Sequence, residues 1–184
     1  SILIGEDGTQ TDVTALSPSE KLGKAGIAYI LQDKSIFPGM TVEENLWMGG
    51  FLKNQPAEAR AAAESIFDKY PTLAARRRHQ AKVLSGGERR LLEISRALVM
   101  NPELLLVDEP SIGLEPRFID MVFEILYDLQ HKEGKTIIMV EQNAKKGLEF
   151  ADIGYVMVSG KIAVAGKGSE LLENPKVGEL FLGG

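Results

Sequence analysis

The sequence predicts an α/β protein with a mainly parallel sheet and helices on the faces of that sheet. Two observations lead to this fold class. Apolar runs of strand length occur at residues 27–31, at residues 104–107 and within the segment KTIIMVEQ, residues 135–142. Segments with the composition or apolar spacing of helices separate these runs, and strands that alternate with helices are typical of βαβ units. At 184 residues and 44% hydrophobic content, the chain is long enough for one well-buried core.

Composition argues against several classes of function. The chain has no cysteine, which excludes disulfides, a thiol nucleophile and a thiolate zinc site, and which is compatible with a reducing compartment such as the cytoplasm. A net charge of -5, with both signs mixed along the chain, argues against a nucleic-acid-binding face. No apolar run approaches the ~20 residues that span a bilayer, so we expect no direct membrane insertion and any membrane role to come through a partner.

The first predicted strand leads directly into a helix. Residues 27–31 are expected to form a buried strand that ends at the polar Gln32. In the segment PGMTVEEN that follows, Thr41 and Glu44 have the T-x-x-E spacing of a capping box. We therefore predict a turn and then a helix that begins at Thr41.

A second helix is predicted in the segment PAEARAAAESIFDKYP. It is rich in strong helix formers, opens at Pro56 and closes before Pro71. Residues 41–81 are therefore expected to form a helical subdomain. The α/β core is then expected to consist of residues 1–40 and 82–184.

The next stretch is predicted to be helix, strand and helix. A second capping box, Ser85 to Glu88, opens a helix with one apolar face that ends at Asn101. Residues 104–107 are a continuous apolar run and are expected to be a buried strand. Residues 116–134 have apolar side chains at helical spacing and a glycine at the end, which indicates another helix.

The last part of the chain is expected to add one more buried strand and a hairpin. The apolar run within KTIIMVEQ is predicted to be buried in the sheet. The segment GYVMVSGKIAVAG indicates a hairpin that turns at Ser159 and Gly160. A helix is predicted from Ser169.

Two acidic residues follow the predicted strand in the segment LLLVDEP. Asp108 is expected at the carboxyl end of the strand, where ligands bind in open α/β sheets. A carboxylate there suits Mg²⁺, and Glu109, which points in another direction, suits a general base acting on water. Two acids that merely solvate the end of a strand are an equally good interpretation of this pair taken alone.

The segment LSGGE, residues 84–88, places two glycines at a helix start. Glycine leaves the backbone N–H groups bare, and the positive end of the helix dipole lies behind them, so an anion such as a phosphate can approach closely. Ser85 adds a hydroxyl donor. The competing interpretation of this segment alone is a plain helix cap with flexible glycines.

Taken together, these two segments resemble a known family. The stretch LSGGERRLLEISRALVMNPELLLVDEPSIGLEP is similar to the signature helix, Walker B strand and D-loop of an ABC-type ATPase. The segments IFPGMTVEENL, RRRHQAKVLSGGE and VEQNAKKGLEFAD most closely resemble the ATPase subunits of branched-chain amino-acid importers. The resemblance runs over nearly the whole chain. It implies a P-loop NTPase-like, three-layer core of RecA type that binds ATP and Mg²⁺.

The resemblance also implies a role for individual residues. Asp108 would support Mg²⁺, Glu109 would be the catalytic base, and Gln32 would sense both Mg²⁺ and the attacking water while coupling to a membrane partner. The signature residues would contact the γ-phosphate of ATP that is bound by the other subunit of a dimer. They are Ser85, Gly86, Gly87 and Glu88.

Two positions depart from the common pattern of the family. The implied D-loop, residues 111–116, has Glu115 where aspartate is usual. Gln142 stands where many members have a histidine that contacts the γ-phosphate and the attacking water. Glutamine both donates and accepts hydrogen bonds but cannot carry a proton, so Glu109 is expected to bear more of the water activation.

The phosphate-binding pattern G-x-x-x-x-G-K-[ST] does not occur in this sequence. Gly134-Lys135-Thr136 lacks the glycine five residues earlier and connects a helix to a strand, which is the reverse of a P-loop. We therefore expect the P-loop and a strand beside residues 104–107 to be absent from this chain. We also expect the chain alone to be inactive and to fold poorly or self-associate.

The resemblance implies transmembrane permease subunits as partners, and a homodimer or a pair with a paralogous ATPase subunit. It also implies a cytoplasmic protein that is peripheral on the inner face of the cell membrane, with no role for nucleic acid. Two alternatives stay open: a soluble ABC ATPase that acts on nucleic acid or ribosomes, and a non-catalytic interaction module. The negative net charge and the short helical segment without coiled-coil heptads count against the first alternative.

Overall fold

The computed structural model describes residues 2–4, 8–32 and 35–182. The parts of the predicted core at residues 1, 5–7, 33–34 and 183–184 lie outside the described residues.

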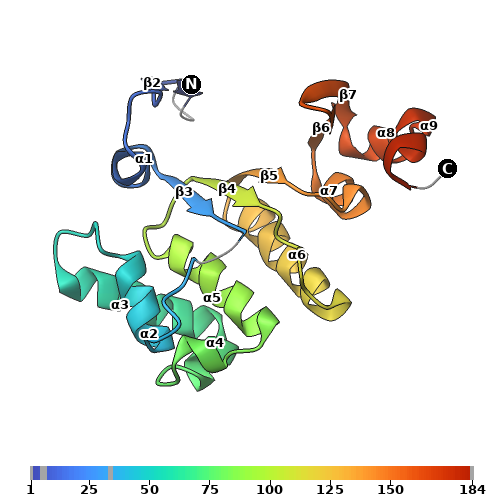
Figure 1. Cartoon of the computed structure of the whole chain (residues 1–184). Helices are drawn as coiled ribbons and strands as arrows, with labels where there is room; N and C mark the ends of the chain where they lie inside the picture. The colour runs from blue at the N-terminus through green and yellow to red at the C-terminus, as the bar shows by residue number, and fades with distance from the viewer. Residues whose placement is uncertain (1, 5–7, 33–34, 183–184) are drawn as a thin grey trace.

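A three-stranded parallel sheet lies in the middle of the molecule (Figure 1). Its strands follow the order β3 (Ile27–Ile30), β4 (Leu104–Asp108) and β5 (Thr136–Val140). All three run in the same direction, which confirms the predicted parallel α/β sheet. Their carboxyl ends therefore lie along one edge of the sheet, the edge at which open α/β sheets bind ligands.

The neighbours of β4 differ from the prediction. β4 pairs with β3 on one side and with β5 on the other, so the expectation that a strand beside residues 104–107 is absent is wrong. Among the described strands, β3 and β5 are the two edge strands of this sheet. An apolar run predicts a strand but not its neighbours, because strand pairing is decided by contacts between distant segments.

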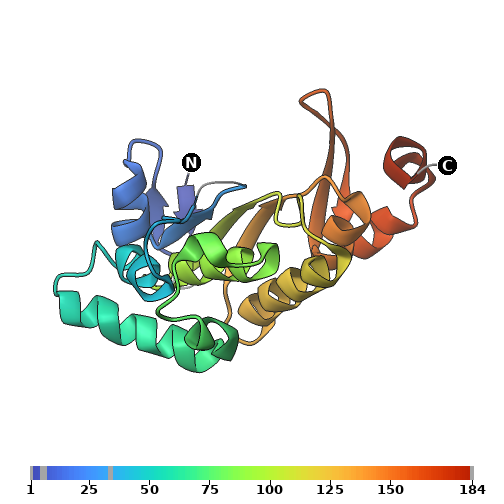
Figure 2. The same cartoon turned by 60° about the horizontal axis from the view of Figure 1, so that its bottom comes forward.

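Helices cover one face of the sheet (Figure 2). α5 (Gly86–Leu98) and α6 (Pro116–His131) pack their apolar sides against this face, where Leu105 of β4 meets Ile94 of α5 and Leu126 of α6 in one buried cluster. Burying one such side chain contributes about 1.5–3 kcal/mol.

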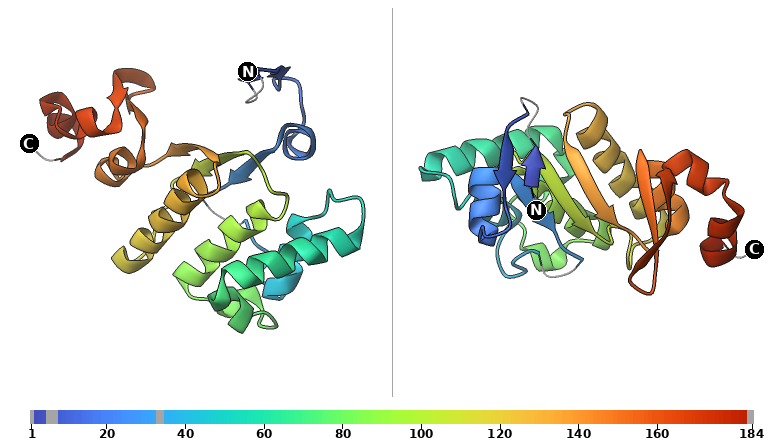
Figure 3. Two further views of the ribbon diagram at one scale, coloured as in Figure 1. Left: turned by 180° about the vertical axis from the view of Figure 1, so that it is seen from behind. Right: turned by 90° about the horizontal axis from the view of Figure 1, so that it is seen from above.

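The opposite face of the sheet is exposed over much of its area. Tyr29, Ile138 and Val140 on that face are 49%, 57% and 62% exposed. The prediction that the apolar run within KTIIMVEQ forms a buried strand is therefore wrong, because side chains in β5 alternate between partly buried and exposed. The described helices α2 to α6 all lie on one side of this sheet, so they leave the other face of β5 uncovered (Figure 3).

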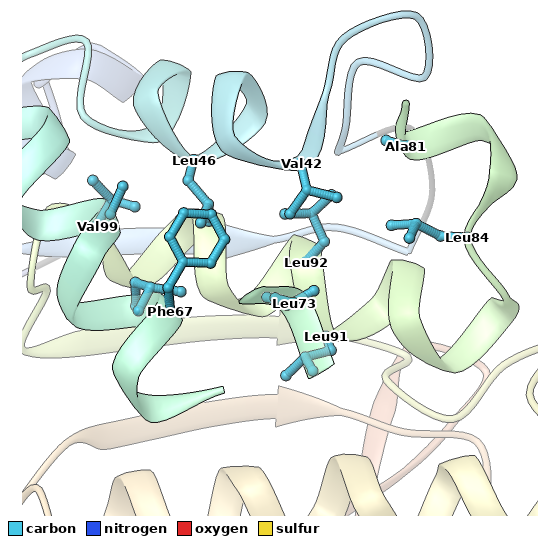
Figure 4. Packing of buried hydrophobic residues seen from close by; sticks show 11 residues of the cluster. Val42, Leu46, Phe67, Leu73, Ala81, Leu84, Leu91, Leu92 and Val99 are labelled. Atoms are coloured by element: carbon cyan, nitrogen blue, oxygen red, sulfur yellow. The ribbon is translucent and has the colours of Figure 1, made fainter. Parts of the chain in front are cut away.

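The helices within residues 41–81 pack on α5 through a shared apolar cluster (Figure 4). They are α2 (Val42–Gly49), α3 (Pro56–Lys69) and α4 (Pro71–Ala75), followed by the 3-10 helix η1 (Ala81–Val83). Leu46, Phe67 and Leu73, one from each α-helix, are buried in this cluster. The predicted Thr41–Glu44 capping box is confirmed. The division of the chain into a subdomain at 41–81 and a core stays a prediction.

The remaining elements lie at the two ends of the chain. They are β1 (Ile2–Ile4), β2 (Gln10–Asp12), α1 (Pro18–Ala25), α7 (Ala144–Phe150), β6 (Ile153–Val158), β7 (Lys161–Lys167), α8 (Gly168–Leu172), α9 (Pro175–Val177) and η2 (Gly178–Leu182). The predicted hairpin is confirmed, since β6 and β7 pair antiparallel around Ser159 and Gly160. Both of these residues have positive φ, as a type I′ turn requires. Within the described ranges, no helix has the length and apolar character to cross a membrane.

Candidate functional site at the carboxyl ends of the strands

Asp108 and Glu109 lie next to each other at the carboxyl end of β4. Asp108 is the last residue of the strand, and its side chain is exposed. Glu109 has a φ of 41°, a left-handed conformation that is uncommon for a residue other than glycine and that recurs at functional sites. Its backbone N–H donates to the carbonyl of Val140 at 2.8 Å, which holds this turn against the end of β5. The predicted difference in direction between the two side chains stays a prediction.

Gln142 is brought against Glu109 across the strand ends. The amide nitrogen Nε2 of Gln142 donates to Oε1 of Glu109 at 2.5 Å. This bond leaves the amide oxygen of Gln142 and the second carboxylate oxygen of Glu109 as acceptors. These two acceptors suit a water molecule that donates a hydrogen bond to the amide oxygen and gives a proton to the carboxylate.

Glu141, which the sequence analysis did not single out, joins the same two loops. Its carboxylate accepts from the Ser111 hydroxyl at 2.8 Å, from the Ser111 N–H at 3.2 Å and from the Asn143 N–H at 2.8 Å. The only local signal for this role is an acid directly after a strand. Its partner Ser111 lies 30 residues away, which no local pattern reveals.

Arg90, also missed in the sequence, ties α5 to two strand ends. Its guanidinium donates to the carbonyls of Leu31 at 2.8 Å and Asp108 at 3.2 Å, and to Glu93 at 2.9 Å. The side chains of Arg90 and Glu93 are 6% and 7% exposed. An arginine and a glutamate three residues apart in a helix indicate an ion pair, but no local pattern indicates that this pair is buried or that Arg90 reaches the strand ends.

Gln32 lies apart from the contact between Glu109 and Gln142. It lies two residues beyond β3, at the same edge of the sheet, and is exposed. Across residues 8–32 and 35–182, no hydrogen bond connects its side chain with Asp108, Glu109 or Gln142. Its place at this edge comes from the parallel pairing of β3 with β4.

Ser85 and Glu88 form the predicted capping box before α5. The Ser85 hydroxyl oxygen accepts from the Glu88 N–H at 3.2 Å, and the Glu88 carboxylate accepts from the Ser85 N–H at 2.9 Å. The Ser85 hydroxyl keeps its own proton for donation to a ligand. The Glu88 carboxylate also accepts a hydrogen bond from Nε of Arg76 at 3.2 Å. Its contacts therefore stabilise the conformation of the turn.

The charge of Glu88 is stabilised by the same contacts. The backbone N–H of Ser85, with help from Arg76, lowers the pKa of Glu88 below its ordinary 4.5. A depressed pKa means that this cap stabilises the fold above about pH 4.5 and weakens as the pH falls through the lower folded-state value.

The two glycines of this turn have different surroundings. Gly86 is exposed, whereas Gly87 is buried under the ring of Phe118 in α6. Leu114 also lies beside Gly86. The turn therefore packs on the residues around the start of α6, where Glu115 is the N-cap. Among the described residues, no hydrogen bond joins the Ser85–Glu88 turn to Glu109 or Gln142.

The acidic side chains of this edge offer few ligands to a metal ion. Within the described parts of the chain, no group of three or more histidine, cysteine, aspartate or glutamate side chains is placed to hold one. Asp108 presents a single exposed carboxylate. This donor set matches an ion that is held by few protein groups together with a substrate's phosphates.

Comparison of the sequence with known proteins finds ABC transporter relatives. Residues 3–112 match the family model described as ABC transporter. The high-affinity branched-chain amino acid transport ATP-binding protein BraG of Pseudomonas aeruginosa is 41% identical over 167 residues, which cover 91% of this chain and 71% of that protein. A probable branched-chain amino acid transport ATP-binding protein, LivF of Archaeoglobus fulgidus, is 37% identical over 94% of this chain and 72% of its own length.

Two further matches widen the comparison. The lipopolysaccharide export system ATP-binding protein LptB of Haemophilus influenzae is 30% identical over 99% of this chain and 73% of its own length. Among solved structures, the ADP conformation of MJ1267, an ATP-binding cassette of an ABC transporter, superposes with a TM-score of 0.77 at 29% identity. That match covers 95% of this chain and 74% of the other.

Proposed function

The chain belongs to the ABC transporter family as an ATP-binding subunit, and from this premise we propose that it hydrolyses ATP to power an importer of branched-chain amino acids. The relatives at 41% and 37% identity, both named for branched-chain amino acid transport, support the choice of substrate. The proposed partners are transmembrane permease subunits and a second ATPase subunit, either a copy of this chain or a paralogue. The proposed location is the cytoplasmic face of the cell membrane.

The observation that carries the catalytic part is the Gln142–Glu109 hydrogen bond next to Asp108. In the proposal, Glu109 is the general base that takes a proton from the water attacking the terminal phosphate of ATP. General bases of this kind contribute about 10²–10⁴-fold in rate. Gln142 orients the water through its free amide oxygen and, since it cannot carry a proton, leaves proton transfer to Glu109.

Asp108 is the residue that we propose as the protein ligand for Mg²⁺. Its exposed carboxylate supplies a hard oxygen donor, and Mg²⁺ is commonly held through one or two carboxylates together with substrate phosphates. When bound, the ion neutralises charge on those phosphates. Gln32, with its side chain at the same edge, is proposed as a further contact to the ion and the water.

The N-terminal turn of α5, with its N-cap Ser85, is proposed to contact the terminal phosphate of ATP held by the second subunit. Ser85 offers its hydroxyl, and Gly86 and Gly87 lie at the positive end of the 13-residue α5. Glu88 keeps the turn in shape through its cap. The sequence lacks the G-x-x-x-x-G-K-[ST] pattern, so we propose that the P-loop is supplied by residues other than these 184. We therefore expect this chain alone to be inactive.

The catalytic proposal is tested with Glu109→Gln in the protein encoded by the whole reading frame that contains these residues. Magnesium-dependent ATP hydrolysis is expected to fall by about 10²–10⁴-fold, because the base is lost while its shape is kept. Glu124→Gln, the same change on an exposed position of α6, is the matched control and is expected to leave the rate unchanged. Equal rates for both variants would contradict the assignment of Glu109.

A second candidate function is suggested by the 30% identity to LptB, which is named for lipopolysaccharide export. Cells that carry Glu109→Gln distinguish the two candidates. The importer proposal predicts loss of leucine, isoleucine and valine uptake with export intact. Normal uptake together with a defect in lipopolysaccharide export would favour the second candidate.

A further inference from the structure

Glu141 lies between the two loops that carry the proposed catalytic groups. One loop follows β4 and contains Glu109 and Ser111; the other follows β5 and contains Glu141 and Gln142. Three sets of hydrogen bonds join them: the Glu109 N–H to Val140, Gln142 to Glu109, and Ser111 to Glu141. The last set is made by the side chain of Glu141, which has no part in the proposed reaction.

The contacts of Glu141 require a carboxylate. Oε1 accepts from the Ser111 hydroxyl and from the Asn143 N–H, and Oε2 accepts from the Ser111 N–H. A glutamine at this position has one acceptor oxygen and one donor nitrogen, so it leaves at least one of the two N–H groups without its acceptor. Ser111 is only 8% exposed, so water is poorly placed to replace that bond.

These contacts fix the backbone around Gln142. Glu141 precedes Gln142, and its carboxylate holds the N–H of Asn143, the residue that follows. The backbone on both sides of Gln142 is thereby held while its side chain reaches Glu109. The same carboxylate holds Ser111, two residues after Glu109. One side chain thus sets the position of both groups in the 2.5 Å contact.

We propose that Glu141 is a positioning residue that holds Gln142 against Glu109 by fixing the loops that carry them. This inference rests on the proposed function, because it assigns Glu141 a part in the same hydrolysis. Glu141 does not touch the reacting atoms and acts only through Gln142 and Glu109. A misplacement of about 1 Å in such a contact costs up to about 10²-fold in rate.

The experiment measures magnesium-dependent ATP hydrolysis for Glu141→Gln in the protein from the whole reading frame. We expect kcat to fall by about 10- to 100-fold, whereas the KM for ATP stays within about threefold, because positioning of the water is lost and not nucleotide binding. Adding Gln142→Ala to Glu141→Gln is expected to lower kcat little further, since both changes remove the same contact.

Asn143→Ala is the matched control for a merely structural effect. It removes the side-chain cap that accepts from the Lys146 N–H at 3.2 Å, but it keeps the backbone N–H that Glu141 holds. This variant loses stability at the same loop, and we expect it to keep a kcat close to that of the wild type. Amide hydrogen exchange of the wild type and Glu141→Gln supplies a readout without activity: protection at Ser111 and Asn143 should fall together.

The outcomes separate this inference from the proposed function. A wild type without magnesium-dependent hydrolysis overturns the proposed function and, with it, the role given to Glu141. An active wild type with an unchanged kcat in Glu141→Gln overturns the inference alone. Equal losses of kcat in Glu141→Gln and Asn143→Ala, or unchanged amide protection at Ser111 and Asn143, overturn it as well.

Discussion

The two adjacent glycines that begin α5 differ in the space that surrounds them. A β-carbon added to Gly86 would lie 3.7 Å from Leu114, an ordinary contact, whereas one added to Gly87 would overlap the ring of Phe118. Only the second glycine is therefore required by packing within this chain. The same ring keeps the turn close to the start of α6.

We expect Gly87→Ala to lower the free energy of unfolding by about 1–3 kcal/mol, because the methyl group must displace Phe118. Gly86→Ala is the matched variant, and it should lower the free energy of unfolding less than Gly87→Ala does, or leave it unchanged. Urea unfolding measures both, and adding Phe118→Leu to Gly87→Ala should recover part of the loss. Equal losses in the two alanine variants would mean that Phe118 does not set the difference.

At this scale, the sequence could predict what depends on near neighbours. The Thr41–Glu44 and Ser85–Glu88 capping boxes span three residues, and both are present. Gln142 was predicted to lie at the end of a strand, and it does. The roles of Glu141 and Arg90 could not be predicted, because their partners lie 30 and 59 residues away.

At the scale of elements, Arg90 is the link between α5 and the ends of β3 and β4. Two strand ends and one helix end meet at a single guanidinium, which is buried together with Glu93. A buried charge that loses its partner costs more than the pair contributes when intact. The relative positions of these three elements should therefore depend on this side chain.

Replacement of Arg90 by methionine is expected to lower the free energy of unfolding by about 3–5 kcal/mol, since it leaves Glu93 buried without this partner. Arg89→Met is the control: Arg89 is the neighbouring residue in the same helix and is exposed, so a change within about 0.5 kcal/mol is expected. Denaturant titration measures both variants. A loss of less than about 1 kcal/mol for Arg90→Met would contradict the account of this link.

Elements were predicted better than their burial. The strands β3, β4 and β5, the hairpin and the helices α5 and α6 follow from local apolar spacing and caps. The burial of β5 does not, because a run of apolar residues looks the same whether a second layer covers its other face or not. The wrong neighbour for β4 has a related cause, since strand order is set by the whole sheet.

For the whole molecule, the exposed face of the sheet is the main consequence of this arrangement. Tyr29 and Ile138 lie on either side of Leu106 across the three strands, on the face opposite α5 and α6. At β5, this apolar face adjoins a strand side that is open among the described residues. Open strand sides and exposed apolar patches of this kind promote association.

We expect the 184-residue chain to self-associate through this face, and Ile138→Lys to shift it toward the monomer. Phe51→Lys is the matched control, because Phe51 is 61% exposed, close to the 57% of Ile138, but lies after α2 and away from the sheet. Sedimentation velocity over a range of concentrations measures both variants. A monomeric wild type, or an equal shift in both variants, would argue against association through the sheet.

The central claim for the whole molecule is that the strand ends form a centre for ATP hydrolysis with Glu109 as its base. The most direct measurement compares the rates of magnesium-dependent ATP hydrolysis for the wild type, Glu109→Gln and Glu124→Gln, each in the protein from the whole reading frame. The account predicts a loss of about 10²–10⁴-fold for Glu109→Gln and none for Glu124→Gln. Hydrolysis by Glu109→Gln at the wild-type rate would contradict it.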